Sequence, residues 1–257
     1  MPSTSPLRVQ LIRHGQSEGN AVGRMEGQQS SGLSKLGRQQ TTALAIALRD
    51  SSPTHLYCSP SRRALETLQV VLDHLQGKAT PTLDALESLL GSPPTQISAT
   101  FRSAADLHTA SIPLVITPDL QEAHGGILQN LTWAEARDRY PDLCHQLETT
   151  PDWLPVPGAE TPEQLRQRSQ RFWRQLLATH HNGDRLWIVS HSGFLQHLIS
   201  EMMGCNRTWG LSIPYTARFE VSVDRDRWQH RNVESIYNRE LWKIHRFNDS
   251  SHLPAPS

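Results

Sequence analysis

Long apolar runs, an excess of charge of one sign and a secretion signal are all missing from this sequence. No stretch approaches the roughly 18 consecutive apolar residues that a membrane-spanning helix needs. The 25 basic and 25 acidic side chains balance to a formal net charge of zero, so the basic surface typical of nucleic-acid-binding proteins is not expected. The opening residues MPSTSPLR do not form a signal peptide. We therefore expect a soluble cytoplasmic protein with neither a membrane nor a nucleic-acid partner.

Cysteine is also scarce. The three cysteines, Cys58, Cys144 and Cys205, are far apart and odd in number, and their spacing does not match a metal site. We expect them to be reduced structural thiols. The 257 residues are enough for one large domain with a substantial core.

Apolar strands alternate with amphipathic helices along most of the chain. This order predicts an α/β fold, a three-layer sandwich in which a mainly parallel sheet carries helices on both faces. From Ala217 onward, apolar and polar residues alternate, which predicts antiparallel strands at the C-terminal edge of the sheet. The expected strands are 7–12, 54–59, 112–118 and 185–190, and the expected helices are 34–50, 61–75 and those that follow Thr132, Thr161 and His191.

A single domain is predicted over 1–257, with three further features. The termini, 1–6 and 248–257, are rich in Ser and Pro and are expected to be disordered. The stretch 89–121 reads as an insertion, which we interpret as a cap that borders the site and helps to select substrate. The alternating C-terminal segment could pair with the edge of a second copy, which would make a homodimer.

Polar side chains follow the predicted strands, at the point where each strand ends. Because ligands of open α/β sheets bind beyond the carboxyl ends of the strands, we expect these side chains at one edge of the sheet. Taken singly, each is an ordinary surface or hydrogen-bonded residue, and the signal is their convergence. The set contains the histidines His14 and His191, the arginines Arg13, Arg62 and Arg63, the carboxylate of Glu122, and Ser192 directly after His191.

This combination of side chains suits phosphoryl transfer. Guanidinium groups hold phosphate oxygens in a fork and keep their charge, while glycine turns and helix N-termini offer backbone N–H groups to an anion. A neutral imidazole can attack phosphorus and carry a covalent intermediate. The second histidine and the arginines would then stabilise the transition state, and Glu122 could protonate the leaving alcohol.

The motifs that carry these residues resemble the histidine phosphatase superfamily, which includes the cofactor-dependent phosphoglycerate mutases. The resemblance covers most of residues 7–200. It rests on the runs LIRHGQSEGN, GLSKLGRQQ, SPSRRALET, LQEAHGG, PGAETPEQLRQR and VSHSGFL, which occur in the family's order.

The resemblance implies a role for each site residue. His14 would be the phosphorylated nucleophile and Glu122 the proton donor, with no metal and no other cofactor. The phosphoryl group or substrate would be bound by Arg13, Arg62, His191, Asn20, Gln16, Ser17 and Ser192. The implied substrate is a small phosphate monoester such as a sugar phosphate, a phosphorylated hydroxy acid or phosphoserine.

The family contains both phosphatases and mutases. The mutases carry a tryptophan-asparagine pair and a Thr-Gly-Trp segment after their first histidine motif, whereas this chain reads Glu18-Gly19-Asn20 followed by AVGRMEGQQSSG. The chain therefore resembles the phosphatase branch, with a phosphoglycerate mutase-type transferase as the alternative. The branches differ in whether water or a second phosphate acceptor reaches the phosphohistidine.

Two places in the sequence depart from the family pattern. Gln129 and Asn130 stand where many members have Glu-Gly, and Gln196 stands where an arginine is frequent. The substrate contacts of these positions therefore cannot be carried over from the family.

Two other classes of protein fit part of the pattern. His14, His191 and Glu122 also form a two-histidine, one-carboxylate set of the kind that holds iron, but the neighbouring arginines would repel a cation. A non-catalytic module that binds a phosphorylated ligand is the other alternative, and the presence of nucleophile, clamp and acid together argues against it. Chelator sensitivity and phosphate release separate the three.

Overall fold

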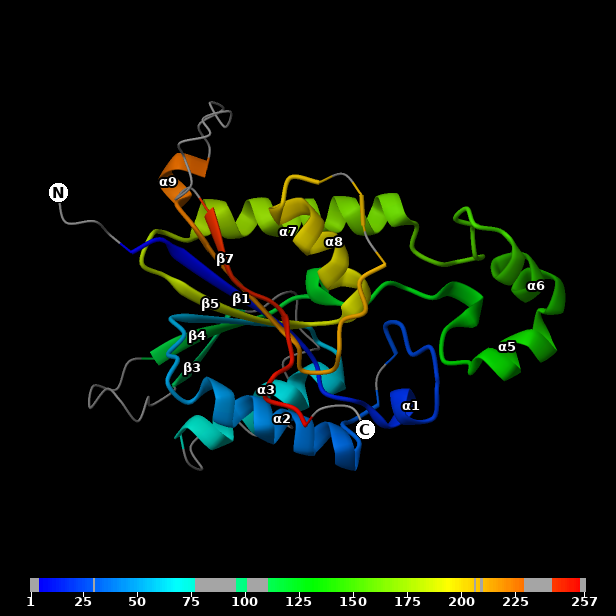
Figure 1. Cartoon of the computed structure of the whole chain (residues 1–257), viewed down its shortest axis with the longest axis horizontal. Coiled ribbons are helices and arrows are strands. Elements are labelled where there is room, and N and C mark those ends of the chain that lie inside the picture. The colour runs from blue at the N-terminus through cyan, green and yellow to red at the C-terminus, as the bar shows by residue number, and fades with distance from the viewer. Residues whose placement is uncertain are drawn as a thin grey trace.

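A seven-stranded sheet forms the centre of the computed structural model (Figure 1). The structure describes residues 5–29, 31–76, 96–100, 111–205, 207–208, 210–228 and 242–254. The strands are β1 (Leu7–Arg13), β2 (His55–Cys58), β3 (Gln96–Thr100), β4 (Ser111–Ile116), β5 (Arg185–Ser190), β6 (Arg218–Val223) and β7 (Trp242–Asp249).

The strand order is β3-β4-β2-β5-β1-β6-β7. The inner strands β4, β2, β5 and β1 are parallel to their neighbours in that group. Strand β3 pairs antiparallel with β4 at one edge, and β6 and β7 form the antiparallel C-terminal edge. The parallel centre and the antiparallel C-terminal strands confirm the predicted sheet. Strand β7 lies at the edge of the sheet, and its pairing with a second copy stays a prediction.

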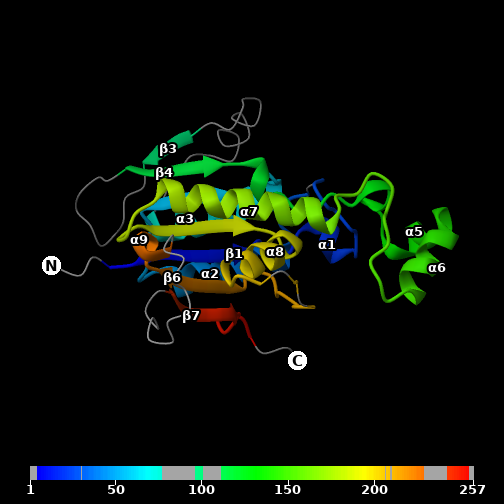
Figure 2. The same ribbon diagram turned by 90° about the horizontal axis from the view of Figure 1, so that it is seen from above.

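Helices cover both faces of the sheet. In Figures 1 and 2, α2 (Lys35–Leu48) and α3 (Arg62–Gln76) lie on one face, and α7 (Pro162–Thr179) and α8 (Ser192–Met202) lie on the other. Because side chains of a strand alternate between its faces, Leu11 of β1 joins the apolar cluster under α7 and α8, whereas Ile12 joins the one over α2 and α3. The predicted three-layer sandwich is confirmed.

Two helices begin where the sequence places a capping box. Thr132 precedes α5 (Trp133–Arg139) and Thr161 precedes α7. In each case the threonine hydroxyl accepts from the backbone N–H three residues on, and the Glu135 or Gln164 side chain accepts from the N–H of the threonine. Pro162 occupies the first helical position of α7, where its missing N–H costs nothing.

A small outgrowth extends beyond the carboxyl ends of the parallel strands. It comprises residues 123–160 and contains α5 and α6, which project to the right in Figure 1. Its own apolar cluster includes Leu131 and Cys144. An ion pair of 2.8 Å between Arg24 and Glu135 ties it to the loop after α1. The remaining helical elements are α1 (Glu18–Ala21), η2 (Pro118–Leu120), η3 (Gly126–Leu128), α6 (Pro141–Thr149) and α9 (Arg225–Trp228).

The described part of the predicted insertion 89–121 belongs mostly to the sheet. Strand β4 lies between β3 and β2, with Leu114 fully buried. The last residues of the insertion, 117–121, lead directly from β4 to Glu122. Residues 89–95 and 101–110 lie outside the described part, so a cap formed by them stays a prediction.

The predicted disorder of 248–257 is wrong for residues 248–254. Strand β7 runs to Asp249, whose carboxylate lies 2.8 Å from Arg218 of β6, and a turn closes with the hydrogen bond from Leu253 N–H to the Ser250 carbonyl. These contacts hold the segment against the sheet. Residues 1–4 and 255–257 lie outside the described residues. Over the described part of the chain, no helix combines the length and the apolar character that a bilayer crossing requires.

Candidate active site

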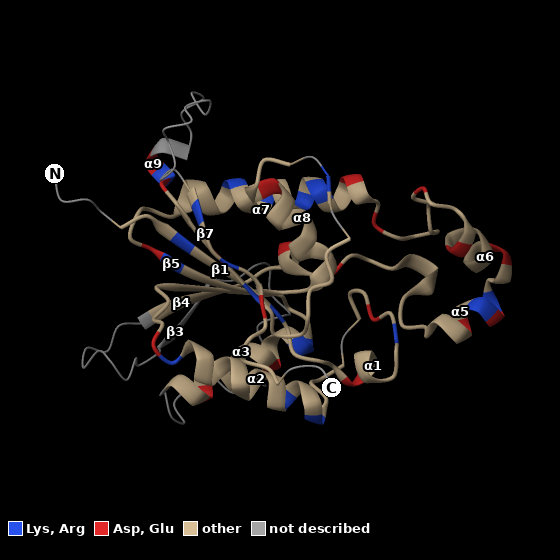
Figure 3. Cartoon of the chain, viewed as in Figure 1, with Lys and Arg blue, Asp and Glu red and all other residues tan. Residues whose placement is uncertain are grey.

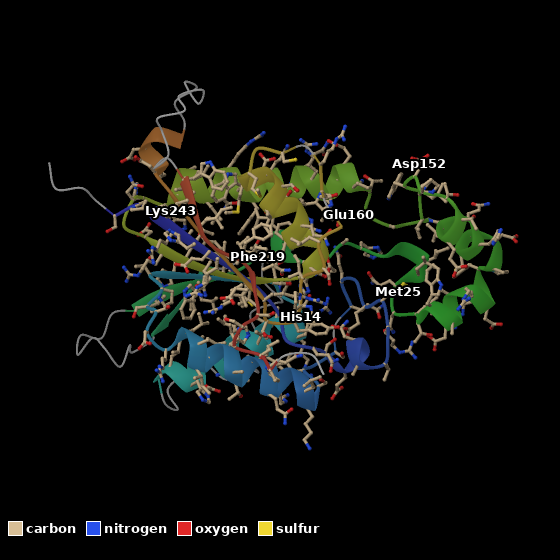
Figure 4. The ribbon with its side chains drawn as sticks, in the orientation of Figure 1. His14, Met25, Asp152, Glu160, Phe219 and Lys243 are labelled. Atoms are coloured by element: carbon tan, nitrogen blue, oxygen red, sulfur yellow. The ribbon has the colours of Figure 1, made fainter. Side chains whose placement is uncertain are left out.

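Three strand ends bring two histidines and a carboxylate to one edge of the sheet. His14 follows β1, His191 follows β5, and Glu122 lies beyond β4. The two histidine rings are both buried, with their centroids 4.9 Å apart in an edge-to-face arrangement. Figure 4 shows His14 near the middle of the molecule, between the two helix layers. The structure thus brings together the two histidines and the carboxylate that were expected to converge.

The arginine that joins the histidines is Arg63, not Arg62. Its Nε lies 3.1 Å from Nε2 of His14, and its Nη2 lies 3.1 Å from Nδ1 of His191. The Arg63 side chain is 2% exposed. That of Arg62 is 52% exposed, and its Nε donates to Glu66 at 2.9 Å. The structure therefore places Arg63 beside the two histidines, where Arg62 was expected, and which arginine binds the phosphate stays a prediction.

The reason why Arg63, and not Arg62, is buried lies outside helix α3. Consecutive residues of an α-helix point about 100° apart, and Arg62 is closer than Arg63 to the apolar stripe that packs on the sheet. Helical periodicity therefore favours burial of Arg62. In the structure, however, the loop after β1 covers the other face of the first turns of α3, where the N–H of Gly15 donates to Thr67 Oγ1 at 3.0 Å. Arg63 is on that second face.

The carbonyl groups of a neighbouring loop fix the Arg63 side chain in place. Its Nη1 donates to the carbonyl of Gln29 at 2.7 Å, and its Nη2 donates to the carbonyl of Gly27 at 2.8 Å. The carboxylate of Glu26 lies 3.6 Å from Nη1. A buried guanidinium needs such partners to offset the cost of leaving water. The loop after α1 thus supports the clamp although it contributes no side chain between the histidines.

His14 is held as a neutral imidazole with a free lone pair on Nε2. Its Nδ1 lies 2.7 Å from the carbonyl oxygen of Gly15. Because a carbonyl only accepts, Nδ1 carries the proton, and Nε2 accepts the hydrogen bond from Arg63. Burial, together with the positive charges of Arg63 and Arg13, holds the pKa of His14 well below its ordinary value. This is the protonation state that a histidine nucleophile requires.

His191 has a similar environment. Its Nδ1 faces Arg63, and its Nε2 lies 2.8 Å from Oγ of Ser59, which accepts the Nε2–H hydrogen bond. Burial, and then the charge of Arg63, holds the pKa of His191 well below its ordinary value. Both imidazoles are therefore neutral, and the positive charge between them belongs to the guanidinium.

Glu122 lies at the N-terminus of α8. Its carboxylate oxygens accept from the N–H groups of Gly193 and Phe194, each at 3.1 Å. A Cβ at position 193 would come within 2.5 Å of Oε1, so glycine permits this close approach. The hydroxyl of Ser190 donates to the carbonyl of Leu120 at 2.7 Å, which ties the end of β5 to the segment that carries Glu122.

Arg13 and Tyr215 form one side of the site. The guanidinium carbon of Arg13 lies 4.0 Å above the centre of the Tyr215 ring, and that ring is 6.1 Å from the ring of His14. The next residue, Thr216, has a φ of +60°, an unusual value for a β-branched residue. Its N–H donates to the His14 carbonyl at 3.3 Å. Sequence analysis missed Tyr215, because it lies in a loop without a recognisable motif.

The other predicted substrate-binding residues lie around this centre. The hydroxyl of Ser17 accepts from the N–H of Asn20 and caps α1. The Gln16 side chain accepts from the hydroxyl of Ser34 at 2.8 Å. Asn20 Oδ1 is buried and has no hydrogen-bond partner among the described residues. Ser192 is half-buried and begins α8. Ser17 and Gln16 therefore have clear local structural roles.

The two positions that depart from the family pattern also hold loops together. Gln129 Oε1 accepts from the N–H of Gln28 at 3.1 Å, which joins the outgrowth to the loop after α1. Gln196 of α8 donates to the carbonyl of Leu211 at 2.8 Å. Both side chains therefore form hydrogen bonds with the backbone of a neighbouring loop.

The charge of the site is local. Figure 3 shows basic and acidic residues side by side on α5 and α7, in agreement with the balanced total charge. The positive potential around His14 therefore comes from Arg13 and Arg63. Because the Arg63 guanidinium contacts Nε2 of His14 and Nδ1 of His191, a cation at these two nitrogens would be repelled, and the two-histidine iron alternative is disfavoured here.

The fold and this site define an α/β enzyme with a buried histidine pair clamped by arginine. The family model for the histidine phosphatase superfamily (branch 1) matches residues 9–91 and 84–235. The chain belongs to the histidine phosphatase superfamily. This confirms the resemblance, and with it the expected class of enzyme, a phosphoric monoester hydrolase.

The known relatives include both kinds of enzyme that the sequence left open, a phosphatase and a phosphoglycerate mutase. A metal-independent phosphoserine phosphatase of Arabidopsis thaliana is 29% identical over 251 residues, which cover 96% of this chain and 83% of the relative. A 2,3-bisphosphoglycerate-dependent phosphoglycerate mutase of Gloeobacter violaceus is 27% identical over 202 residues, covering 74% and 81%. The solved structure of YhfR from Bacillus stearothermophilus matches with a TM-score of 0.68 at 22% identity, covering 96% of this chain and 98% of that one. The last comparison confirms the fold.

Proposed function

We propose that this protein hydrolyses small phosphate monoesters without a metal, through a phosphohistidine formed at His14. The observation that carries the proposal is the position of Arg63, whose guanidinium contacts both His14 and His191. A guanidinium in that position can bind the oxygens of a phosphoryl group at the nucleophile. The phosphoserine phosphatase among the relatives supports the same reaction class.

In the first step, the Nε2 lone pair of His14 attacks phosphorus as the phosphate group replaces the hydrogen bond from Arg63. The N–P bond forms and the bond from phosphorus to the ester oxygen breaks. The N–H groups of Arg63 stay close enough to bind the phosphoryl oxygens, and Arg13 adds a second positive charge. These preorganised donors stabilise the negative charge of the transition state.

Glu122 is the proposed proton donor in this step. In its protonated form, Glu122 gives a proton to the leaving ester oxygen, so an alcohol departs and Glu122 is left as a carboxylate. In the second step a water molecule attacks the phosphohistidine, and Glu122 takes back a proton. Phosphate leaves, and His14 returns to its neutral form.

The proposed substrate is a sugar phosphate, a phosphorylated hydroxy acid or phosphoserine. Each has a phosphate monoester that Arg63 and Arg13 can hold. Phosphoserine is the first compound to test, because one relative is named for its hydrolysis. A mutase reaction shares the first step and differs in the acceptor, and the relative named as a phosphoglycerate mutase keeps it as the second candidate.

The test is phosphate release from a panel of monoesters in excess EDTA, together with trapping of the labelled enzyme. We expect release from one or a few compounds, unaffected by the chelator, and a phosphoenzyme that is labile in acid and stable in base. Release that stops in EDTA and returns with a metal would overturn the proposal. Transfer between phosphoglycerates without release would favour the mutase.

Replacing Glu122 with glutamine should slow the first turnover of an alkyl phosphate on the order of 10²–10³-fold, because the alkoxide then leaves without its proton. The loss should be far smaller for p-nitrophenyl phosphate, since nitrophenolate leaves without protonation. Rapid-quench measurement of the first turnover on both substrates checks this. An equal loss on both would remove Glu122 from the role of proton donor.

A further inference from the structure

A second group of titratable side chains lies at the amino ends of the parallel strands, whereas His14 lies at their carboxyl ends. His55 is the first residue of β2, Asp184 directly precedes β5, and His180 ends α7. Among the described residues, these three offer one ligand atom each, and the three atoms lie within 4.8 Å of one another. The proposed phosphatase reaction uses none of them.

The contacts within this group are close. Nδ1 of His180 lies 3.2 Å from Oδ2 of Asp184, and the rings of His55 and His180 meet edge to face with centroids 4.5 Å apart. His180 has a side chain only 2% exposed, whereas those of His55 and Asp184 are partly accessible. The group is therefore buried at His180 and accessible to solvent at His55 and Asp184.

We propose that His55, His180 and Asp184 bind a divalent transition metal ion of the zinc type. Two imidazoles and a carboxylate are ligands that zinc, cobalt and nickel accept, and water would complete the coordination. Tetrahedral zinc with bonds of about 2.0–2.1 Å places its ligand atoms roughly 3.3 Å apart. His180 and Asp184 already have this spacing. The side chain of His55, which is partly accessible, closes the remaining distance.

Tyr57 provides the support that such a histidine ligand needs. Its hydroxyl lies 2.7 Å from Nε2 of His180. In the metal-free chain the Nδ1–H of His180 donates to the Asp184 carboxylate. When the ion binds, the ring would take the other tautomer, in which Nε2–H donates to the Tyr57 hydroxyl and the Nδ1 lone pair faces the ion. Outer hydrogen bonds of this kind orient metal-binding histidines.

The proposed metal has no direct part in catalysis. Asp184 and His191 lie at opposite ends of β5, whose six residues separate them by roughly 20 Å at about 3.3 Å per residue. An ion here would instead link the end of α7 to the starts of β2 and β5. We expect it to stabilise the fold and to leave phosphate release unchanged.

The test is titration of the EDTA-treated full chain with Co²⁺, followed by its visible absorption. We expect one ion per chain and a rise in the melting temperature. His55→Ala and Asp184→Asn should each weaken Co²⁺ binding at least about tenfold, the scale on which loss of one ligand-shell contact acts. The matched control is His181→Ala, which removes an exposed neighbouring imidazole and should bind Co²⁺ as the parent does.

The variants should retain phosphate release, which shows that they fold. Two results would overturn the proposal. The first is a parent chain that binds no Co²⁺. The second is a His55→Ala variant that binds Co²⁺ as tightly as the parent, which would assign the group to a hydrogen-bond network alone.

Discussion

Replacing His14 with alanine is expected to lower kcat on the order of 10⁶-fold, the scale observed when a covalent nucleophile is removed. The reason is chemical, because the proposed N–P bond forms on Nε2 of His14, whose lone pair faces Arg63. Nδ1 of His191 also faces Arg63, but in the proposed reaction His191 binds the phosphoryl group and does not attack it. The measurement is phosphate release under saturating substrate, with phosphoenzyme trapping alongside.

The control for this variant is His145→Ala, which removes an exposed imidazole on α6 and should leave kcat unchanged. Because His14 is buried, the melting temperature of the variant must also be compared with that of the parent. Free imidazole should restore part of the activity by occupying the space left by the side chain. A variant that keeps one-tenth or more of the parent kcat would show that His14 is not the nucleophile.

Replacing Arg63 with alanine should lower kcat on the order of 10²–10³-fold, the cost of one lost donor in a preorganised site. The same change at Arg62 should leave kcat within about twofold, since the half-exposed Arg62 pairs with Glu66 and not with the histidines, and Glu66 keeps its second ion pair with Arg38. The two residues are adjacent, and they therefore serve as matched tests of the structural assignment. The measurement is kcat and KM for both variants on the same monoester.

Arg63→Lys separates charge from geometry. A lysine keeps the positive charge but lacks the planar fork that reaches both histidines and the loop carbonyls, so its kcat should stay well below that of the parent. Melting temperatures identify any variant that loses activity by unfolding. A raised KM with an unchanged kcat in Arg63→Ala would limit Arg63 to substrate binding. A larger loss in Arg62→Ala than in Arg63→Ala would contradict the assignment.

The elements of the fold were predictable because their signals are local. The capping boxes at Thr132 and Thr161 use contacts between residues three apart, and the structure shows both. The apolar runs of β1 and β5 reflect burial on two faces. The meeting of His14 and His191 was also predictable, because neighbouring parallel strands end at the same edge.

Only the tertiary structure could decide which side chain of the first turn of α3 faces the site. Arg62 and Arg63 share the same helix and the same charge, and the apolar stripe favours Arg62. The choice depends on the loop after β1, which covers the face of α3 that carries Arg63. No contact within the helix encodes that cover, and the family resemblance, from which Arg62 was predicted, did not separate the two adjacent arginines.

The same distinction explains the remaining differences. Tyr215 reaches Arg13, and Asp249 reaches Arg218, only because the sheet places β1, β6 and β7 side by side. By itself, the sequence determined most of the strands and helices, the class of enzyme, and the strand ends at which His14 and His191 meet. The tertiary structure decided which arginine lies between the histidines and which segments surround them. Local propensities act between near neighbours, whereas side-chain burial depends on segments that are distant in the chain.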